Sequence, residues 1–388
     1  MRITATRFAS SLLAALLAFF EADLSACTTA IVSAEASGTG RPLLWKQRDA
    51  GDDFNALAYV RGEKYGFTAL FQTSDKERLN AYAGINEAGF AVTNNLSYNL
   101  RPESQGVAGT RNGALMTRAL GSCRLVDDFQ ALLESMERPM HLSANFAVMD
   151  AEGGAAYFEV SDTAFVRFDV PKGGYLFRTN YSLSGDPGRG RGFARYATMT
   201  DRMSKAHRLT PEFLLETGRS FVNVLEGGDA LSGRRDGYLY EHDFIPRSTT
   251  TASIVIEGVA PGEDPASGLM WCAPGYTPAC YAIPVWVAAG DRLPLALIGD
   301  APANRLAVQY KAALRTLDWD SKYVEVKPLK AILKCVREAE KAEFKAGRRL
   351  DRQFRRTGFD SAALVRFNEE ADLRFSRYQT RTSLVFSR

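Results

Sequence analysis

The first pattern of apolar and polar positions after residue 26 is that of a β-hairpin. Two β-rich runs, 27–33 and 42–47, are separated by a cluster of turn residues. Such an arrangement predicts two paired strands. If Gly38 is the centre of the turn, residues whose numbers sum to about 76 lie opposite each other. This register places Cys27 beside Asp49.

Further strands and helices follow along the chain. Strands are expected at 80–85, 90–95, 145–149, 155–160 and 252–257, with tight turns at 86–89 and 152–154. Apolar residues at three-to-four spacing between Val126 and Met136 predict an amphipathic helix. Thr210 is a good N-cap, and Pro211 suits the first position of a second helix. The pattern therefore predicts a chain of mixed helices and antiparallel strands.

The C-terminal part of the chain is expected to be helical and basic. The 388 residues carry a formal net charge of +3, and residues 302–388 hold 20 Lys and Arg against 11 Asp and Glu. A basic helical segment can bind nucleic acid or an anionic membrane surface. Here acidic residues are interleaved at helix-pairing distances, which favours a solvated helical hairpin with an accessory role. No nucleic-acid partner is expected.

Residues 1–26 have the composition of an export signal. Arg2 and Arg7 precede an apolar run over 8–20, which is too short to span a bilayer. A buried N-terminal helix is the alternative, because Glu21 and Asp23 are unusual near a cleavage site. Export would make the protein periplasmic or secreted.

Export also bears on the five cysteines, because exported chains tend to form disulfides. Cys272 and Cys280 flank a short loop and are expected to pair. Cys123 and Cys335 lie in helix-like sequence, where an isolated cysteine is most often a small buried apolar residue.

The sequence lacks the residues of the common catalytic sites. It has three histidines, with no metal-binding pattern, no Gly-x-Ser-x-Gly elbow and no phosphate-binding loop. A nucleophilic cysteine here therefore needs another proton acceptor. If the signal is removed before Cys27, its own α-amine, with an ordinary pKa of roughly 7.7 to 8.0, can take the thiol proton.

Four segments then resemble, in order, the choloylglycine hydrolase group of N-terminal-nucleophile hydrolases. They are Cys27-Thr28-Thr29, the run from Leu44 to Asp49, the run from Gly84 to Phe90, and Arg178-Thr179-Asn180. The group includes bile salt hydrolases, penicillin V acylases and, more distantly, isopenicillin-N acyltransferases. The resemblance implies an α+β fold, an αββα sandwich of two antiparallel sheets between helix layers, with the basic helices as a C-terminal extension.

The resemblance also assigns roles to individual residues. Cys27 matches the nucleophile, and Asp49 matches the aspartate that orients the nucleophile's amine. Asn180 matches an asparagine whose amide faces the oxyanion, and either Asn94 or Asn95 should be its partner. Such donors stabilise the tetrahedral intermediate by a few kcal/mol.

Two positions depart from the family pattern. Lys46 stands where the bile salt hydrolases carry an arginine, and a lysine cannot make a bidentate contact as an arginine can. Arg247 is a candidate for a late family arginine but lies in a different local pattern. We include both among the candidate catalytic residues.

The sequence therefore predicts a hydrolase of a linear, non-peptide amide bond that needs neither metal nor organic cofactor. Its expected parts are a signal peptide (1–26), a hydrolase domain (27–301) and a basic extension (302–388). Its expected partner is a small amide substrate. Trp45, Tyr59, Tyr82 and Tyr98 suggest an apolar acyl pocket, with a place in the hydrophobic core as an equal alternative for each. The sequence does not decide the oligomeric state, and a homo-oligomer is one of the alternatives.

Two alternatives use the same Cys27. Acyl transfer to an amine instead of water would employ the same machinery. Residues 24–27 also fit a lipobox, in which lipidation of Cys27 would anchor a binding protein to a membrane and consume both nucleophile and base.

Overall fold

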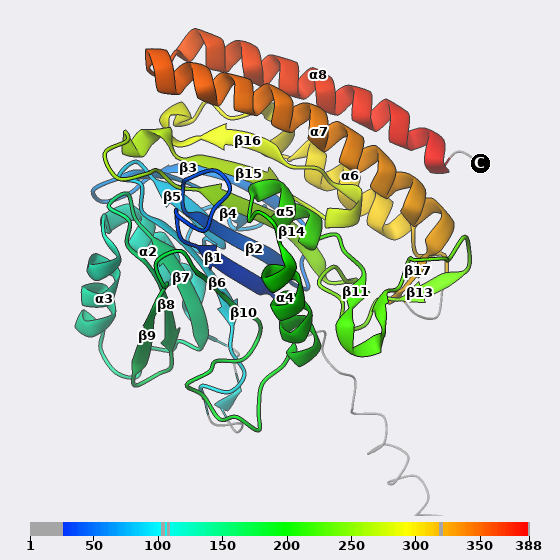
Figure 1. The fold of residues 1–388 in the computed structure, drawn as a ribbon. Coiled ribbons are helices and arrows are strands. Elements are labelled where there is room, and N and C mark those ends of the chain that lie inside the picture. Colours follow the sequence, from blue (N-terminus) through cyan, green and yellow to red (C-terminus); the bar gives the residue numbers. More distant parts are fainter. Residues whose placement is uncertain (1–25, 102–104, 107–108, 318–320, 387–388) are drawn as a thin grey trace, which may run out of the picture.

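A computed structural model describes residues 26–101, 105–106, 109–317 and 321–386. Two antiparallel sheets lie face to face with helices on their outer sides (Figure 1). The predicted αββα sandwich and its C-terminal helices are confirmed. The predicted signal sequence lies outside the described residues except for Ala26.

One sheet has six strands in the order β10-β1-β2-β14-β15-β16. Its strands are β1 (Thr28–Val32), β2 (Leu43–Asp49), β10 (Tyr175–Arg178), β14 (Thr250–Glu257), β15 (Leu269–Ala273) and β16 (Ile283–Trp286). The first hairpin, β1–β2, therefore forms as predicted, in the middle of this sheet.

The register of that hairpin is one residue away from the prediction. Thr28 lies opposite Gln47 rather than Arg48. The connection is not a symmetrical turn about Gly38, because Ser37 bridges to Leu209 and the Gly38 N–H donates to the Leu209 carbonyl. Contact with a distant segment has shifted the centre of the turn.

The second sheet has seven strands in sequence order. They are β3 (Asn55–Arg61), β4 (Gly66–Gln72), β5 (Ala83–Asn86), β6 (Ala91–Leu96), β7 (Ala144–Met149), β8 (Ala155–Val160) and β9 (Phe165–Asp169). Two helices, α2 (Asn112–Ser122) and α3 (Val126–Ser135), cover its outer face. An apolar cluster that includes Phe129, Phe146 and Phe158 fills the space between this sheet and the helices.

The remaining helices lie over the six-stranded sheet (Figure 1). They are α4 (Phe193–Lys205), α5 (Pro211–Thr217), α6 (Pro302–Ala313), α7 (Val326–Thr357) and α8 (Ser361–Phe386). Short strands β11 (Val222–Asn223), β12 (Gly228–Asp229), β13 (Tyr238–Tyr240) and β17 (Tyr323–Glu325) form two small ribbons. The N-cap at Thr210 is confirmed, since its side chain accepts from the Phe213 N–H.

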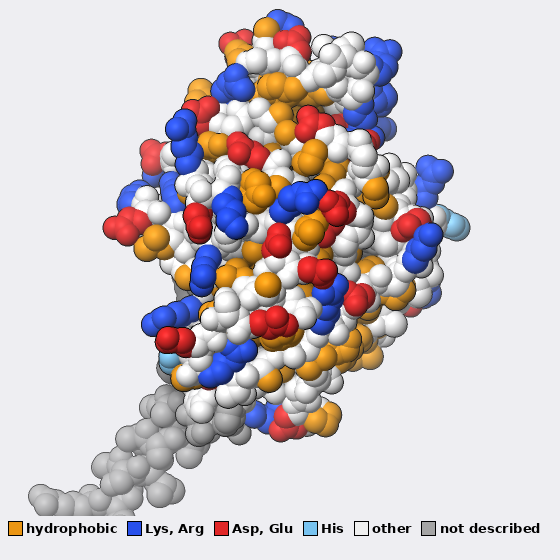
Figure 2. All heavy atoms as spheres, turned by 90° about the vertical axis from the view of Figure 1, so that its left-hand side faces the viewer, with side chains coloured by type: hydrophobic (Ala, Val, Ile, Leu, Met, Phe, Trp, Pro, Cys, Tyr) orange, Lys and Arg blue, Asp and Glu red, His pale blue; other side chains and the backbone are white. Residues whose placement is uncertain are grey.

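The C-terminal helices share the main hydrophobic core. Trp271 of β15 stacks on Phe344 of α7 with ring centroids 3.9 Å apart, and Trp286 of β16 contacts Phe354 and Phe367. Several basic residues of these helices are paired, for example Arg348 with Glu257. On the face in Figure 2, basic and acidic side chains are interspersed. The domain boundary at residue 302 stays a prediction.

The expected disulfide between Cys272 and Cys280 is wrong, because all five cysteines are free. Cys272 is fixed in the middle of the sheet, opposite Ile254 on one side and Ile283 on the other. Cys280 follows a 3-10 turn, and its thiol donates to the Tyr281 carbonyl. Burial raises the pKa of the Cys280 thiol to about 12. Cys272 and Cys280 are therefore buried free thiols. The sequence had predicted this state for Cys123 and Cys335 but not for these two.

No helix among the described residues is long and apolar enough to cross a membrane.

Candidate active site

Cys27 lies at the start of β1, between the two sheets, with 5% of its surface exposed. Its Sγ is 3.6 Å from the backbone oxygen of Asp49, at the end of the neighbouring strand β2. The shifted register thus still brings Cys27 next to Asp49, through the main chain of Asp49.

The Asp49 carboxylate is completely buried, and Thr250 and Arg247 are among its contacts. Oδ1 accepts a hydrogen bond from Thr250 Oγ1 at 2.7 Å, and Arg247 Nε lies 3.5 Å from Oδ2. Burial raises the pKa of Asp49, while Arg247 and Arg195 act in the opposite direction. The structure therefore brings Arg247 to the site that contains Cys27 and Asp49.

Lys46 holds Asn94 by two contacts. Lys46 Nζ donates to the Asn94 backbone oxygen at 2.5 Å and to its side-chain Oδ1 at 2.9 Å. Burial lowers the pKa of Lys46 to about 8, although the nearby Cys27 opposes this shift. Because the amide oxygen of Asn94 faces Lys46, the amide N–H₂ group must face the other way. Lys46 thus sets the orientation of the Asn94 donor.

Asn95 has a different role from its neighbour. Its Oδ1 accepts from Thr29 Oγ1 at 2.6 Å, and its Nδ2 donates to the Thr179 carbonyl. It is fully buried and is not part of the lining of the cavity that contains Cys27, whereas Asn94 is. The geometry therefore favours Asn94 of the two asparagines left open by the sequence.

Asn180 lies on the same side of Cys27 as α4. Its Nδ2 donates to the Leu96 carbonyl at 2.8 Å, and its Oδ1 accepts from Arg195 Nη2 at 2.8 Å. These contacts fix the Asn180 side chain firmly. The predicted donation to an oxyanion stays a prediction.

Arg195 is the site residue that sequence reasoning missed. It is 1% exposed, and its Nη1 donates to the Cys27 carbonyl at 2.6 Å and to Thr28 Oγ1 at 2.8 Å. Burial lowers the pKa of Arg195 to about 9, and Arg247 adds to the shift. One guanidinium thereby connects the backbone of Cys27 with the side chain of Asn180.

The local sequence explains how α4 delivers this arginine. Arg195, Thr198, Met199 and Met203 form the buried face of α4, so an arginine stands at a position whose spacing calls for an apolar residue. Gly192 precedes the helix with φ +85°, and a Cβ there would lie 2.3 Å from Arg195 Nη2. The buried face of the helix was the available signal for Arg195.

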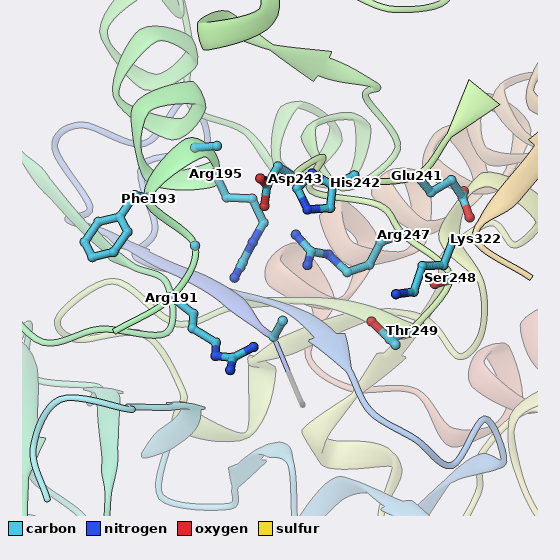
Figure 3. A pocket seen from close by; sticks show the side chains of 13 residues that line it. Arg191, Phe193, Arg195, Glu241, His242, Asp243, Arg247, Ser248, Thr249 and Lys322 are labelled. Carbon is cyan, nitrogen blue, oxygen red and sulfur yellow. Dashed lines mark ion pairs between the residues drawn. The ribbon is translucent and has the colours of Figure 1, made fainter. Parts of the chain in front are cut away.

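Two cavities meet near Cys27. The Cys27 cavity has a volume of about 270 Å³, and its lining includes Cys27, Lys46, Asp49, Tyr82 and Asn94. The arginine cavity has a volume of about 310 Å³ and is lined by Ala26, Arg191, Arg195, Arg247 and Lys322, among others (Figure 3). The chain thus passes from one cavity to the other between Ala26 and Cys27.

Only part of the predicted aromatic pocket lies here. Tyr82 lines the Cys27 cavity, together with polar residues such as Gln72 and Asn112. Trp45 is fully buried and donates to Ser253, and Tyr59 donates to Glu87. Within the described residues, no group of three His, Cys, Asp or Glu side chains could hold a metal ion.

Comparison with known proteins finds a match to one sequence-family model in the middle of the chain. Residues 60–230 match the family model described as acyl-coenzyme A:6-aminopenicillanic acid acyl-transferase. The matched segment is less than half of the 388 residues, and it contains Asn94, Asn180 and Arg195 but not Cys27. No curated protein matches the chain.

Several solved structures are similar at low identity. The N-acylethanolamine-hydrolyzing acid amidase ortholog of Caenorhabditis elegans has 12% identity and a TM-score of 0.40, covering 59% of this chain and 92% of that one. Penicillin V acylase from Agrobacterium tumefaciens has 15% identity and a TM-score of 0.38, covering 66% and 85%. A variant of conjugated bile acid hydrolase from Clostridium perfringens has 13% identity and a TM-score of 0.36, covering 64% and 89%.

The description of the matching family model is that of an acyl-transferase. With its family match over residues 60–230 and its two stacked antiparallel sheets, the chain resembles the N-terminal-nucleophile hydrolases, as its sequence motifs predicted.

Proposed function

We propose that this protein hydrolyses a linear, non-peptide amide bond, with Cys27 as the nucleophile once residues 1–26 have been removed. The observation that carries the proposal is that Lys46, Asn94 and Arg195 all lie close to Cys27. Its Sγ lines a cavity shared with Lys46 and Asn94, and its carbonyl is held by Arg195. A cysteine with no histidine partner gains a base when its own amine becomes free.

In the first half of the proposed reaction, the α-amine of Cys27 accepts the thiol proton and the sulfur attacks the amide carbon. A carbon–sulfur bond forms, and the carbonyl electron pair moves to oxygen. The Asn94 N–H₂ group, turned away from Lys46, donates to that oxyanion. The carbon–nitrogen bond then breaks, and the leaving nitrogen takes the proton from the α-ammonium.

In the second half, water attacks the thioester. The α-amine takes a proton from the water, the carbon–sulfur bond breaks, and the thiolate recovers its proton. The products are a carboxylic acid and an amine. Asp49, held by Thr250 and Arg247, supplies the negative charge that keeps the α-ammonium in place.

Asn180 has a positioning role in this scheme. Its Oδ1 accepts a hydrogen bond from Arg195 Nη2, and Arg195 Nη1 donates a hydrogen bond to the Cys27 carbonyl. The two residues together fix the main chain at Cys27, so that sulfur and amine face the substrate.

Acyl transfer is the second candidate, favoured by the description of the matching family. The same thioester would be attacked by an amine in place of water. Adding increasing concentrations of a primary amine during turnover separates the two: a transferase forms new amide in proportion, whereas a hydrolase forms free acid.

The maturation of Cys27 is the first test of the proposal. Intact mass spectrometry of the protein from its native host should give the mass of residues 27–388 without any addition to Cys27. Export to the periplasm or medium, which we also propose, is read by fractionation of the same cells. A diacylglyceryl group on Cys27 would instead establish the lipoprotein alternative and end the proposed mechanism.

Two variants test the chemistry itself. A chain that keeps Ala26 ahead of Cys27 lacks the free amine and should hydrolyse no amide. Cys27→Ser in the mature chain should retain the fold and lose activity by a factor on the order of a thousand, since its hydroxyl is a weaker nucleophile. Unchanged activity in either variant would assign the reaction to another group.

A further inference from the structure

The arginine cavity lies on the opposite side of the Ala26–Cys27 bond from the Cys27 cavity. Ala26 lines the former, and the Cys27 side chain lines the latter. Removing residues 1–26 therefore leaves the α-amine of Cys27 beside the space that Ala26 lines in the arginine cavity. The space that Ala26 occupies becomes part of that cavity.

Cationic side chains dominate the walls of this cavity. Arg191, Arg195, Arg247 and Lys322 all line it, and Figure 3 shows their charged ends turned toward its middle. They come from the segment before α4, from α4 itself, from the loop before β14 and from the residue before β17.

Part of this positive charge is balanced. Glu241 pairs with Arg315, outside the cavity, and accepts from the Tyr276 hydroxyl. Asp243 Oδ2 lies 3.2 Å from His242 Nδ1, and its carboxylate also offsets part of the charge of Arg195. Arg247 is paired with Asp49. Arg191, by contrast, forms no ion pair among the described residues, and its guanidinium lies over the Tyr98 ring at 5.4 Å. The cavity therefore has an excess of positive charge.

An adjoining cavity extends this space. It shares His242 with the arginine cavity, has a volume of about 530 Å³, and is lined by Tyr238, Tyr240 and Tyr323, among others. Tyr240 stacks on His242 with centroids 5.5 Å apart, and 38% of its surface is exposed. Exposed rings at the edge of a cavity offer a flat apolar surface to a ligand.

The proposed reaction decides which part of a substrate enters here. The leaving nitrogen must receive its proton from the α-ammonium, so the amine portion of the substrate lies on the α-amine side of the sulfur. The acyl portion then lies in the Cys27 cavity beside Asn94. The amine portion thus faces the arginine cavity.

We infer that the preferred substrate carries its negative charge and an aromatic or similarly bulky group on the amine portion, as in an N-acyl aromatic amino acid. Its carboxylate lies among Arg191, Arg247 and Lys322, and its ring lies toward Tyr240. A guanidinium presents several donors in one plane and suits a carboxylate. This inference rests on the proposed function for the direction in which the substrate binds.

A matched pair of substrates tests the charge. N-acetylphenylalanine and N-acetylphenethylamine differ only by the carboxylate. The mature protein should prefer the first in kcat/KM by about tenfold or more, which corresponds to about 1.4 kcal/mol. In an Arg191→Gln/Lys322→Gln double variant, the preference should fall to about twofold or less through a higher KM. Arg235→Gln, an exposed arginine outside the lining, should keep it.

A binding measurement separates this inference from the proposed activity. Calorimetric titration of mature Cys27→Ala protein with the same two compounds should show the same preference for the carboxylate and its loss in the double variant. Equal binding of both compounds overturns the inference, even if amides are hydrolysed. Carboxylate-selective binding without any hydrolysis by the unsubstituted protein overturns the proposed function and leaves the anion site standing.

Discussion

Two arginines, Arg195 and Arg219, are each 1% exposed, yet they lie in opposite electrostatic surroundings. Arg219 makes a two-pronged contact with Glu340 of α7, with both nitrogen–oxygen distances 2.6 Å. Burial disfavours its charge, but Glu340 outweighs burial, and the pKa of Arg219 is raised. Within the described part of the chain, Arg195 donates to the neutral oxygens of Cys27, Thr28 and Asn180. Burial outweighs the nearby carboxylates of Asp49 and Asp243, and the pKa of Arg195 is lowered to about 9.

The comparison separates structural from functional use of a buried charge. A buried guanidinium with its own carboxylate is compensated within the fold, and breaking the pair costs several kcal/mol. A buried guanidinium that donates to neutral oxygens, with carboxylates nearby but not hydrogen-bonded to it, has its charge only partly compensated, which destabilises the fold but favours negative charge nearby. We therefore assign the region around Arg219 to the stability of the fold and propose that the region around Arg195 serves the proposed reaction.

The largest expected effect comes from breaking the compensated pair. Glu340→Gln removes the charge that balances Arg219 and weakens the acceptor for the Ala282 N–H. We expect the free energy of unfolding to fall by about 3 to 5 kcal/mol, as measured by urea denaturation. The activity of each folded molecule should stay unchanged, because Glu340 lines neither cavity at Cys27.

The same helix offers a matched control. Glu338 pairs with Arg381 at the surface, where both side chains are about half exposed. Glu338→Gln should cost less than about 1 kcal/mol. If the two variants lost equal stability, the contrast between compensated and surface charge would not hold for this helix.

A smaller effect, on activity rather than on stability, is expected from substituting Arg195. Arg195→Gln should lower kcat/KM by about a hundredfold, or about 2.7 kcal/mol, because the Cys27 backbone loses its anchor. Its unfolding free energy should change by less than that of Glu340→Gln, since an unpaired buried charge is removed. A variant that is destabilised yet fully active per folded molecule would place Arg195 with Arg219 as a structural residue.

The difference between the two arginines also marks what could be predicted from sequence. Local patterns predicted the β1–β2 hairpin, the strands around β5–β8 and the N-cap at Thr210, because each depends on neighbours a few residues away. The hairpin register was wrong by one residue, because Leu209, far along the chain, contacts its turn. The disulfide between Cys272 and Cys280 was wrong, because sheet pairing fixes Cys272 on both sides.

The candidate site shows the same limit. The motif resemblance selected Cys27, Lys46, Asp49, Asn180, Arg247 and one of Asn94 and Asn95. The fold brings the first five near one another, together with Asn94. Arg195 was missed because its contacts to Cys27 and Asn180 span up to 168 residues of sequence. An arginine on the apolar face of a helix was the single local sign of it, and only a folded chain shows what it meets.

The smallest effect concerns Lys46, a buried cation that also lacks an ion pair among the described residues. Its pKa is lowered by burial to about 8, below the ordinary value of 10.5. Between these two pH values the unfolded chain binds more protons at Lys46 than the folded protein does, so folding stability should rise with pH there. We expect a gain of about 1 kcal/mol between pH 8 and pH 9, measured as the difference in unfolding free energy between the unsubstituted protein and Lys46→Met.

Substituting the exposed Lys345 by Met should leave the dependence of the unfolding free energy on pH as it is in the unsubstituted protein. If the unfolding free energy of Lys46→Met changed with pH just as that of the unsubstituted protein does, Lys46 would have an ordinary pKa in the folded protein. Its ammonium group would then stay charged while it contacts Asn94, as an arginine would.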